Sequence, residues 1–502
     1  MKTAVSVPVP LRFLAGLLWL MVAASSGRGE GSKPLGMGRV PLLFVDDAGV
    51  ATQSGVVRVV HPARTRTRPV LEPDRPWEGD RVYTYGSVNF DSATGEFMLW
   101  YMSRTQRADG IKPAPQLRAG GQDVVLLALS RDGIAWRKPE LGLHAYLGSK
   151  ANNLVFDVHS PSVVVDRFES DPARRFKLLG YSRGGYVVAH SPDGVRWSEF
   201  PGNPVFKGGD TVSMTQDPRT GEFLVYHKRP DPEQPGRVVW LSRSRDLRNW
   251  SEPVRVLRSD TEDQRWATSP DQRTDIYNMT VLPHAGGFVG LPTVFRVMSV
   301  LPKGTKTALG QSGQDGPIDV QLATSADGET WRRSWPRVAM IPRGAPGAFD
   351  AGVILGLTSN HLDVGDETWI YYTAINTGHG APIPPKRATL GLAVWRRHGF
   401  ASLDAGPTGG AVETVPLKFA TPEVVVNADA AQGAVRVAVR ESDGTPVAGL
   451  AAAECEPLRV DATRWAVRWT TAVTVPVDRP VRLRFEMKNA RLYSVAGSDE
   501  SR

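Results

Sequence analysis

Cysteine is nearly absent from this sequence, which contains a single one, Cys455, in 502 residues. One cysteine cannot form an intrachain disulfide, so burial and hydrogen bonding must stabilise the fold. The nine histidines have no zinc-ligand spacing, and neither a phosphate-binding loop nor a nucleophile elbow occurs. No run of Lys or Arg is long enough for a nucleic-acid tail. We therefore expect no cofactor and no nucleic-acid partner. A structural Ca²⁺ is compatible with the sequence but has no motif of its own.

Long hydrophobic runs are also missing, except for one near the start. Lys2 and Arg12 precede the apolar run 13–24, and small residues follow at 23–27. This order is typical of a secretory signal peptide. The run is short for a membrane span, and no later segment is longer. We expect residues 1–30 to be a cleaved signal peptide and the protein to be secreted or periplasmic, without a stable membrane span. An uncleaved anchor is the alternative.

Glycine and proline, in contrast, are plentiful, at 50 and 39 residues. They favour many turns, and therefore many short strands, over long helices. The net charge of +8 arises from 60 basic and 52 acidic residues that alternate along the chain. We interpret this as a mixed, solvated surface. A sulfated or uronic acid substrate would suit the excess charge, although charge alone does not establish one.

A repeated pattern, Ser-x-Asp-x-x-x-Trp, organises much of the chain. Asp-Gly favours a tight hairpin because glycine accepts a positive φ and the aspartate caps nearby N–H groups. The tryptophan supplies a large apolar side chain at the start of the next strand. An apolar, strand-like run precedes each copy, which predicts the outer hairpin of a sheet. The copies occupy 130–136, 191–197, 244–250 and 325–331.

A second pattern lies upstream in several repeats, where two strand-like runs flank a polar turn. The runs 88–101 and 214–226 share the turn Thr-Gly-Glu-Phe. Each repeat is therefore two hairpins, or four strands, which is the size of a propeller blade. The sequence predicts an all-β fold: a five-bladed β-propeller with an N-terminal closing segment in residues 31–405, followed by a C-terminal β-sandwich in 406–502, where apolar and polar residues alternate without the motif.

With these hairpins, the chain resembles bacterial five-bladed β-propeller proteins described as glycosyl hydrolase family 32-like and family 43-like. The resemblance rests also on the segments 138–142, 148–154, 276–279 and 402–406. It implies an exported glycoside hydrolase that acts on an oligo- or polysaccharide. In such enzymes, carboxylates at the starts of the innermost strands surround an axial funnel. Glycosidic cleavage needs one protonated and one ionised carboxyl group.

The strand openings of this chain are mostly acidic, and the resemblance implies their roles. The expected catalytic residues are Glu78, Asp210, Asp275 and Asp350. The expected substrate-binding residues are Trp77, Asp157, His159, Lys228, Tyr277, Asn278 and Arg296.

The chain departs from the family 32 pattern in lacking its Trp-x-Asn-Asp-Pro nucleophile motif. This absence supports an alternative function, a non-catalytic carbohydrate- or protein-binding propeller. A third hypothesis is a structural module of a surface assembly, docked through the sandwich. Two carboxyl groups about 5–10 Å apart in a funnel would favour hydrolysis, whereas a shallow surface with outward aromatic residues would favour binding.

Overall fold

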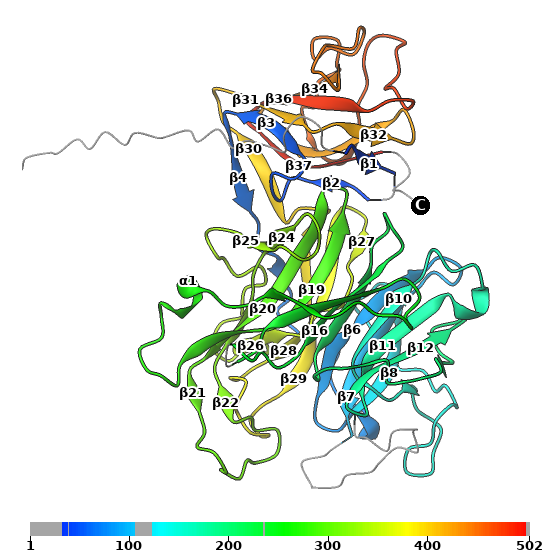
Figure 1. Cartoon of the computed structure of the whole chain (residues 1–502), viewed down its shortest axis with the longest axis vertical. Helices are drawn as coiled ribbons and strands as arrows, with labels where there is room; N and C mark the ends of the chain where they lie inside the picture. The colour runs from blue at the N-terminus through cyan, green and yellow to red at the C-terminus, as the bar shows by residue number, and fades with distance from the viewer. Residues whose placement is uncertain (1–32, 39, 106–122, 234–235, 498–502) are drawn as a thin grey trace, which may run out of the picture.

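The protein is an all-β molecule (Figure 1). The computed structural model describes residues 33–38, 40–105, 123–233 and 236–497, and every count of elements refers to these residues. The expected signal peptide lies outside them. The described helical segments are short: η1 (Pro76–Glu78), η2 (Pro172–Arg174) and α1 (Thr261–Gln264). No helix in the described part of the chain is long and apolar enough to cross a membrane.

Three antiparallel sheets follow one another between residues 82 and 257, and we call them the first three units. The first unit comprises β6 (Val82–Asp91), β7 (Glu96–Arg104), β8 (Asp123–Ser130) and β9 (Leu154–Phe156). The second comprises β10 (His159–Val165), β11 (Phe176–Ser182), β12 (Gly185–Ser191), β13 (Ser198–Glu199) and β14 (Phe206–Lys207). The third comprises β15 (Val212–Gln216), β16 (Phe223–Lys228), β17 (Val239–Ser244) and β18 (Val254–Leu257).

The fourth and fifth units form one ten-stranded sheet, joined where Ile318 pairs in parallel with Val353. The fourth unit comprises β19 (Arg273–His284), β20 (Gly287–Val297), β23 (Ile318–Val320), β24 (Ala323–Ser325) and β25 (Arg332–Arg333). The fifth comprises β26 (Val353–Leu355), β27 (Leu362–Val364), β28 (Glu367–Ile375), β29 (Ala388–Arg396) and β5 (Arg64–Thr65). A separate hairpin, β21 (Ser299–Val300) and β22 (Gln314–Asp315), extends from the fourth unit.

Hydrogen bonds join the innermost strand of each unit to that of the next. The Ser87 hydroxyl accepts from Val163 N–H at 2.7 Å, and the Ser162 hydroxyl accepts from Met214 N–H at 3.1 Å. The remaining links run from Thr211 to Tyr277 and from Thr280 to Thr358. The fifth unit also contacts the first, through the hydroxyl pair Ser87–Ser359 at 2.5 Å and the bond from Tyr85 N–H to the Gly356 carbonyl at 2.9 Å.

The four motif copies form the predicted outer hairpins. In the second unit, the Ser191 hydroxyl donates to Asp193 Oδ1 at 2.9 Å, and the same oxygen accepts from Val195 and Arg196 N–H. Strand β13 then pairs with β12. The glycine after the aspartate has a positive φ of 70°, 72° or 79° in the three copies that carry it. The sequence pattern therefore identified the turn chemistry correctly.

Two six-stranded sheets pack against each other at one end of the molecule and form the sandwich. One contains β1 (Leu35–Met37), β3 (Val50–Ser54), β31 (Gly410–Thr414), β32 (Leu417–Phe419), β34 (Ala434–Glu441) and β36 (Val481–Lys488). The other contains β2 (Leu42–Leu43), β4 (Val56–Val60), β30 (Ala401–Ala405), β33 (Val424–Asp429), β35 (Asp461–Ala466) and β37 (Ala490–Gly497). Val437, Phe485 and Leu492 belong to the buried core between them.

The strand pairing of residues 35–60 differs from the expected domain boundary. The sequence predicts that residues 31–405 form the propeller, yet β1 pairs with β32, and β4 pairs with β30. Only β5, further along, joins the fifth unit. Short strands with few distinguishing residues do not reveal their partner in sequence, because long-range pairing sets it.

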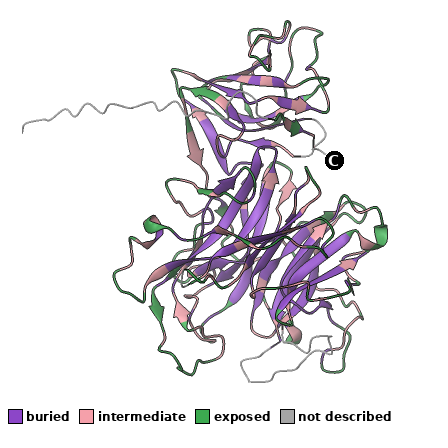
Figure 2. Ribbon diagram, in the orientation of Figure 1, coloured by how far each residue is buried: buried purple, intermediate pink, exposed green. Residues whose placement is uncertain are grey.

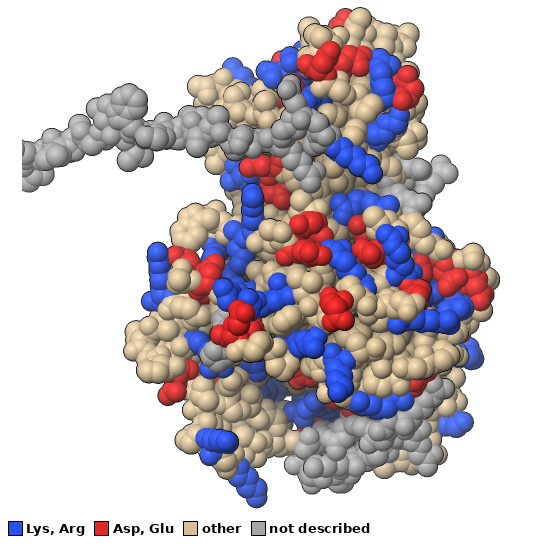
Figure 3. Space-filling model, in the orientation of Figure 1, with Lys and Arg blue, Asp and Glu red and all other residues tan. Residues whose placement is uncertain are grey.

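Buried apolar side chains line the strands of every unit and of the sandwich (Figure 2). Cys455 lies buried in the sandwich core. On the face seen in Figure 3, basic and acidic side chains are interspersed, as expected for a mixed surface. Among the described residues, no group of three or more His, Cys, Asp or Glu side chains is arranged to hold a metal ion.

Candidate functional site

Because neighbouring strands of a unit run in opposite directions, alternate loops lie at the same end of the unit. In an antiparallel unit, the start of the innermost strand lies at the same end as the loop between the second and third strands. Figure 1 places the hairpin β21–β22, which belongs to one such loop, at the end away from the sandwich. Ionisable side chains gather there from several units, and we call them the inner cluster: Tyr85, Arg104, Asp123, His159, Asp210, Lys228, Arg237, Asp275, Tyr277 and His379.

Asp210 lies just before β15 and is the accessible carboxylate among the four expected catalytic residues. Its side chain is 45% exposed and accepts a hydrogen bond from Lys228 Nζ at 2.8 Å. Burial raises the pKa of Asp210, but the Lys228 ammonium, with smaller contributions from His159 and Arg237, holds that pKa below its usual value. Asp210 is therefore ionised at neutral pH.

Asp275 lies deeper, at the start of β19, with a side chain only 1% exposed. Its two oxygens form ion pairs with Arg237 and Arg273, each at 3.0 Å. The Arg237 guanidinium also lies 4.7 Å from the centre of the Tyr277 ring. Asp275 thus fixes Arg237 against Tyr277, an arrangement that orients an arginine for hydrogen bonding to an oxygen-rich ligand.

Tyr277 and His379 close the cluster on the side of the fifth unit. The ring nitrogen Nδ1 of His379 lies 3.1 Å from the Gln314 carbonyl, which can only accept, so Nδ1 carries the proton. The Tyr277 hydroxyl then donates to Nε2 at 3.2 Å. Burial lowers the pKa of His379 to about 4, so this imidazole is neutral at physiological pH.

The cluster also contains His159, Tyr85 and the ion pair of Arg104 with Asp123, whose atoms are 2.7 Å apart. The rings of Tyr85 and His159 meet edge to face at 5.7 Å. Burial lowers the pKa of His159, although Asp123 and Asp210 act against this. Burial, together with the nearby Tyr277 and Asp210, raises the pKa of Tyr85 well above its usual value. Both groups are neutral at pH 7.

Lys386, on the loop after β28, is a buried cation beside the cluster. Its ammonium donates to the carbonyls of Gly310 and His379, each at 2.7 Å. Burial and the neighbouring Arg81 lower the pKa of Lys386 to about 8. It joins the loop that carries His379 to the loop that carries Gln314.

Glu78 and Trp77, also expected at the site, lie instead in a buried network of the first unit. The Glu78 carboxylate is fully buried and accepts from Tyr101 at 2.6 Å and from Lys138 at 2.7 Å. It also accepts from the N–H groups of Asp74 and Arg75. The Trp77 indole donates to Asn153 Oδ1. These contacts occupy both side chains within the protein, and their recorded partners are not members of the inner cluster.

The structure places the four remaining expected residues as follows. Asp350 is buried and accepts from the Tyr372 hydroxyl at 3.0 Å, within the fifth unit. Asn278 is buried and bonded to Thr293 across a bulge in β19 and β20. Arg296 lines a separate surface cavity with Trp266 and Trp335. Asp157 is buried between β9 and β10.

The structure therefore brings together Asp210, Asp275, His159, Lys228 and Tyr277 from the expected set. It adds Tyr85, Arg104, Asp123, Arg237 and His379, which the sequence did not single out. Most of these additions lie at or between the second and third strands of a unit. Since those loops share an end with the innermost strand starts, a search of polar residues there would have found them.

Comparison with known proteins is limited to structural similarity. No protein-family model and no curated protein sequence matches the chain. The structure is similar to a β-1,2-mannobiose phosphorylase from Listeria innocua, with 12% identity, a TM-score of 0.42, and coverage of 68% of this chain and 97% of the other. It is similar to a glycoside hydrolase with 12% identity, a TM-score of 0.42 and coverage of 66% and 92%. It is also similar to a thermostable family-43 glycoside hydrolase, with 13% identity, a TM-score of 0.40, and coverage of 65% of this chain and 90% of the other.

Proposed function

We propose that the five units are the blades of a closed five-bladed β-propeller and that the protein is a glycoside hydrolase whose substrate binds at the inner cluster. The hydrogen bonds between successive innermost strands, including those from the fifth unit to the first, support closure. The resemblance of the hairpin motif to propeller glycosidases supports the substrate class. We also propose that residues 1–30 direct export and are removed.

One observation carries the proposal: the exposure of Asp210 at a strand start beside neutral and cationic groups. Glycosidic cleavage needs an ionised carboxylate facing the sugar. Asp210 is 45% exposed, and its pKa is lowered, so it fits the role of base or nucleophile. Lys228 and Arg237 supply donors for sugar oxygens, and Asp275 positions Arg237.

A second function, carbohydrate binding without cleavage, is favoured by the burial of the other expected carboxylates. Glu78 and Asp275 have 0% and 1% exposed side chains, and both are ion-paired. A hydrolase needs a second group that delivers a proton to the leaving oxygen, and a binding protein does not.

Product release from a panel of polysaccharides and aryl glycosides separates the two functions. We expect Asp210→Asn to reduce release by at least about 100-fold with the fold retained, because an amide cannot act as base or nucleophile. The matched control is Asp193→Asn, which changes an aspartate of a distant hairpin and should keep full release. Release by the wild type that is equal in Asp210→Asn would exclude the role of Asp210. Oligosaccharide binding without release would establish the second function.

A further inference from the structure

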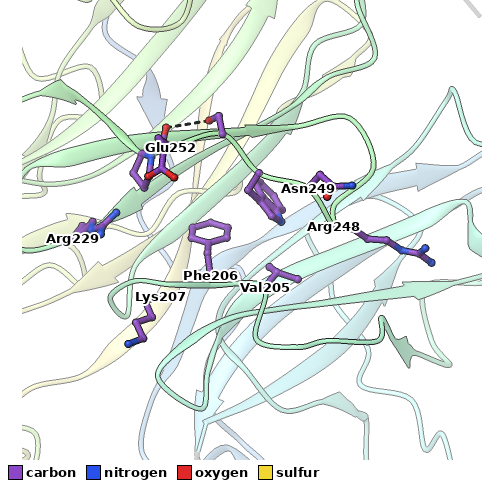
Figure 4. A pocket seen from close by; sticks show the side chains of 10 residues that line it. Val205, Phe206, Lys207, Arg229, Arg248, Asn249 and Glu252 are labelled. Atoms are coloured by element: carbon purple, nitrogen blue, oxygen red, sulfur yellow. Dashed lines mark hydrogen bonds between the residues drawn. The ribbon is translucent and has the colours of Figure 1, made fainter.

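A cavity of about 410 Å³ lies on the outer side of the third unit, next to β14 (Figure 4). Its volume is in the range of small-molecule sites. Phe206 and Lys207 of β14 line one side, and Arg229 follows β16 directly. The turn after β17, which carries the third hairpin motif, completes the wall with residues 248–253.

The side chains that line this cavity carry an excess of positive charge. Lys207, Arg229 and Arg248 line it together with one carboxylate, Glu252. In the described part of the chain, no carboxylate is recorded within ion-pairing distance of these three cations. Aromatic rings hold the two arginines instead: Arg229 lies 5.8 Å from the ring of Trp240, and Arg248 lies 5.6 Å from that of Phe200. Their N–H groups therefore remain available for an anion.

In two other surface cavities, lining cations are paired with carboxylates. In one, Lys177 is paired with Glu169 at 2.7 Å. In the other, Arg337 is paired with Asp260 and with Asp263 at 2.8 Å. Lys177 and Arg337 are neutralised within the protein, whereas Lys207 and Arg229 are not. Arg248 lines both the cavity of Lys177 and the cavity beside β14.

The same cavity has an aromatic floor. The half-buried rings of Phe206 and Trp250 lie 4.8 Å apart. In Figure 4, Arg229 and Arg248 lie on opposite sides of Phe206, and the Arg248 side chain points away from that ring. Asn249 and Ser251 add amide and hydroxyl groups at the rim. A sugar ring has an apolar face that packs on such rings, while its substituents hydrogen-bond to polar side chains around them.

The cavity adjoins the Asp210–Lys228 pair along the chain. Lys207 precedes Asp210 by three positions, and Arg229 is the residue after Lys228. The Tyr186 hydroxyl donates to the Gly209 carbonyl at 2.9 Å and so anchors the segment that joins them. Two walls of the cavity are therefore continuous along the chain with the two members of this pair.

From these observations we propose that this cavity binds an anionic sugar unit, a uronate or a sulfate ester, of the same polysaccharide that reaches Asp210. The proposal rests on the proposed function for the identity of the ligand as a sugar. Its charge preference rests only on Lys207, Arg229 and Arg248.

Calorimetric titration of the Asp210→Asn protein tests the cavity without turnover. The probes are trigalacturonic acid, a sulfated galactan trisaccharide and neutral galactotriose, and the first two distinguish a carboxylate from a sulfate. We expect at least one anionic probe to bind more tightly than the neutral one. The pair Lys207→Ala and Arg229→Ala should weaken it at least about tenfold, because two charge-assisted contacts are lost. The matched control removes two exposed arginines elsewhere, Arg66→Ala and Arg68→Ala, and should leave the affinity unchanged.

Several results would overturn the proposal. These are no binding of either anionic probe, equal binding of the neutral probe, an unchanged affinity in the Lys207 and Arg229 variant, or equal binding of an acidic peptide of the same charge. Because the readout is affinity in a protein without turnover, a failure here is distinct from a failure to release product. Unchanged melting temperatures of both double variants establish that the fold is intact.

Discussion

The two ends of the five units contrast sharply in their regularity. At the hairpin end, the four motif copies repeat one arrangement: the serine hydroxyl accepts from the N–H three residues on at 2.9, 2.9, 2.8 and 2.9 Å. At the opposite end, each unit contributes different residues, from Asp210 and Lys228 to Tyr277 and His379. The repeated end carries the turn chemistry that four of the five units share, whereas the divergent end carries the inner cluster, where we propose that the substrate binds.

The third hairpin shows how the repeat tolerates a change. At three interfaces, a ring from a neighbouring unit donates to the carbonyl of the motif glycine: Tyr371 to Gly133, Trp100 to Gly194 and Tyr226 to Gly328. A Cβ on any of these glycines would lie within 3.0 Å of an aromatic side chain. The third copy carries Leu247 in place of glycine, and the corresponding position of the second unit is Leu179. Both leucines belong to one buried cluster.

The largest effect on stability that we predict concerns Glu78. This residue was expected at the divergent end, but it lies in a buried network of the first unit. Glu78→Ala should lower the free energy of unfolding by about 3–5 kcal/mol, because it leaves the buried Lys138 ammonium and the Tyr101 hydroxyl without a major partner. Denaturant unfolding monitored by tryptophan fluorescence measures this.

The matched control for this change is Glu96→Ala. Glu96 also pairs with a cation of the first unit, Arg137, at 2.8 Å, but at the surface. Its removal should cost no more than about 1 kcal/mol. A Glu78→Gln protein as stable as the wild type but unable to release product would instead restore a catalytic role for Glu78.

A smaller effect on stability, one that depends on pH, is expected from Lys386 at the divergent end. Its pKa is about 8 in the folded protein, below its usual value, so the unfolded chain binds more protons above this pH. The stability contributed by Lys386 therefore rises with pH, by about 2 kcal/mol from about pH 7.5 to about pH 9.5. The difference in unfolding free energy between the wild type and Lys386→Met, measured at both pH values, isolates this rise. A difference that does not change with pH would contradict the burial of a charged amine.

The smallest predicted change in the free energy of unfolding concerns the third hairpin. Leu247 has a φ of 62° and is fully buried. Leu247→Gly relieves a strained backbone but removes a buried side chain, for a net loss of about 1 kcal/mol. Adding Leu179→Tyr recreates the arrangement of the other interfaces and should recover this loss. Chemical unfolding of both single variants and the double variant gives the coupling energy. Additive effects would mean that the two positions are independent.

The hairpins and the all-β class were predictable from sequence because they depend on local chemistry. Ser191, Asp193 and Gly194 form their contacts within four residues, so the pattern alone indicates the turn. The candidate site was predictable only in part. Asp210 and Asp275 were found because they precede or open apolar strands, which a sequence displays directly.

The remaining site residues depend on contacts that sequence spacing does not reveal. Arg237 lies near Asp275 because two neighbouring units meet, and His379 lies near Tyr277 although 102 positions separate them. The burial of Glu78 depends on a contact of the same long-range kind. Glu78 precedes a strand like the other acidic residues, but Lys138, 60 positions away, encloses it.

The pairing of residues 35–60 with residues 401–497 has a consequence for biosynthesis. Strands β1–β4 are made before the five units, yet their partners β30–β32 and β37 are made after them. The sandwich must therefore form after all five units have been synthesised, at the cost of closing a long loop. During this interval the early strands have exposed, unpaired edges, which favour aggregation. Proteins that hold nascent chains in an unfolded state would protect these strands until residues 401–497 emerge.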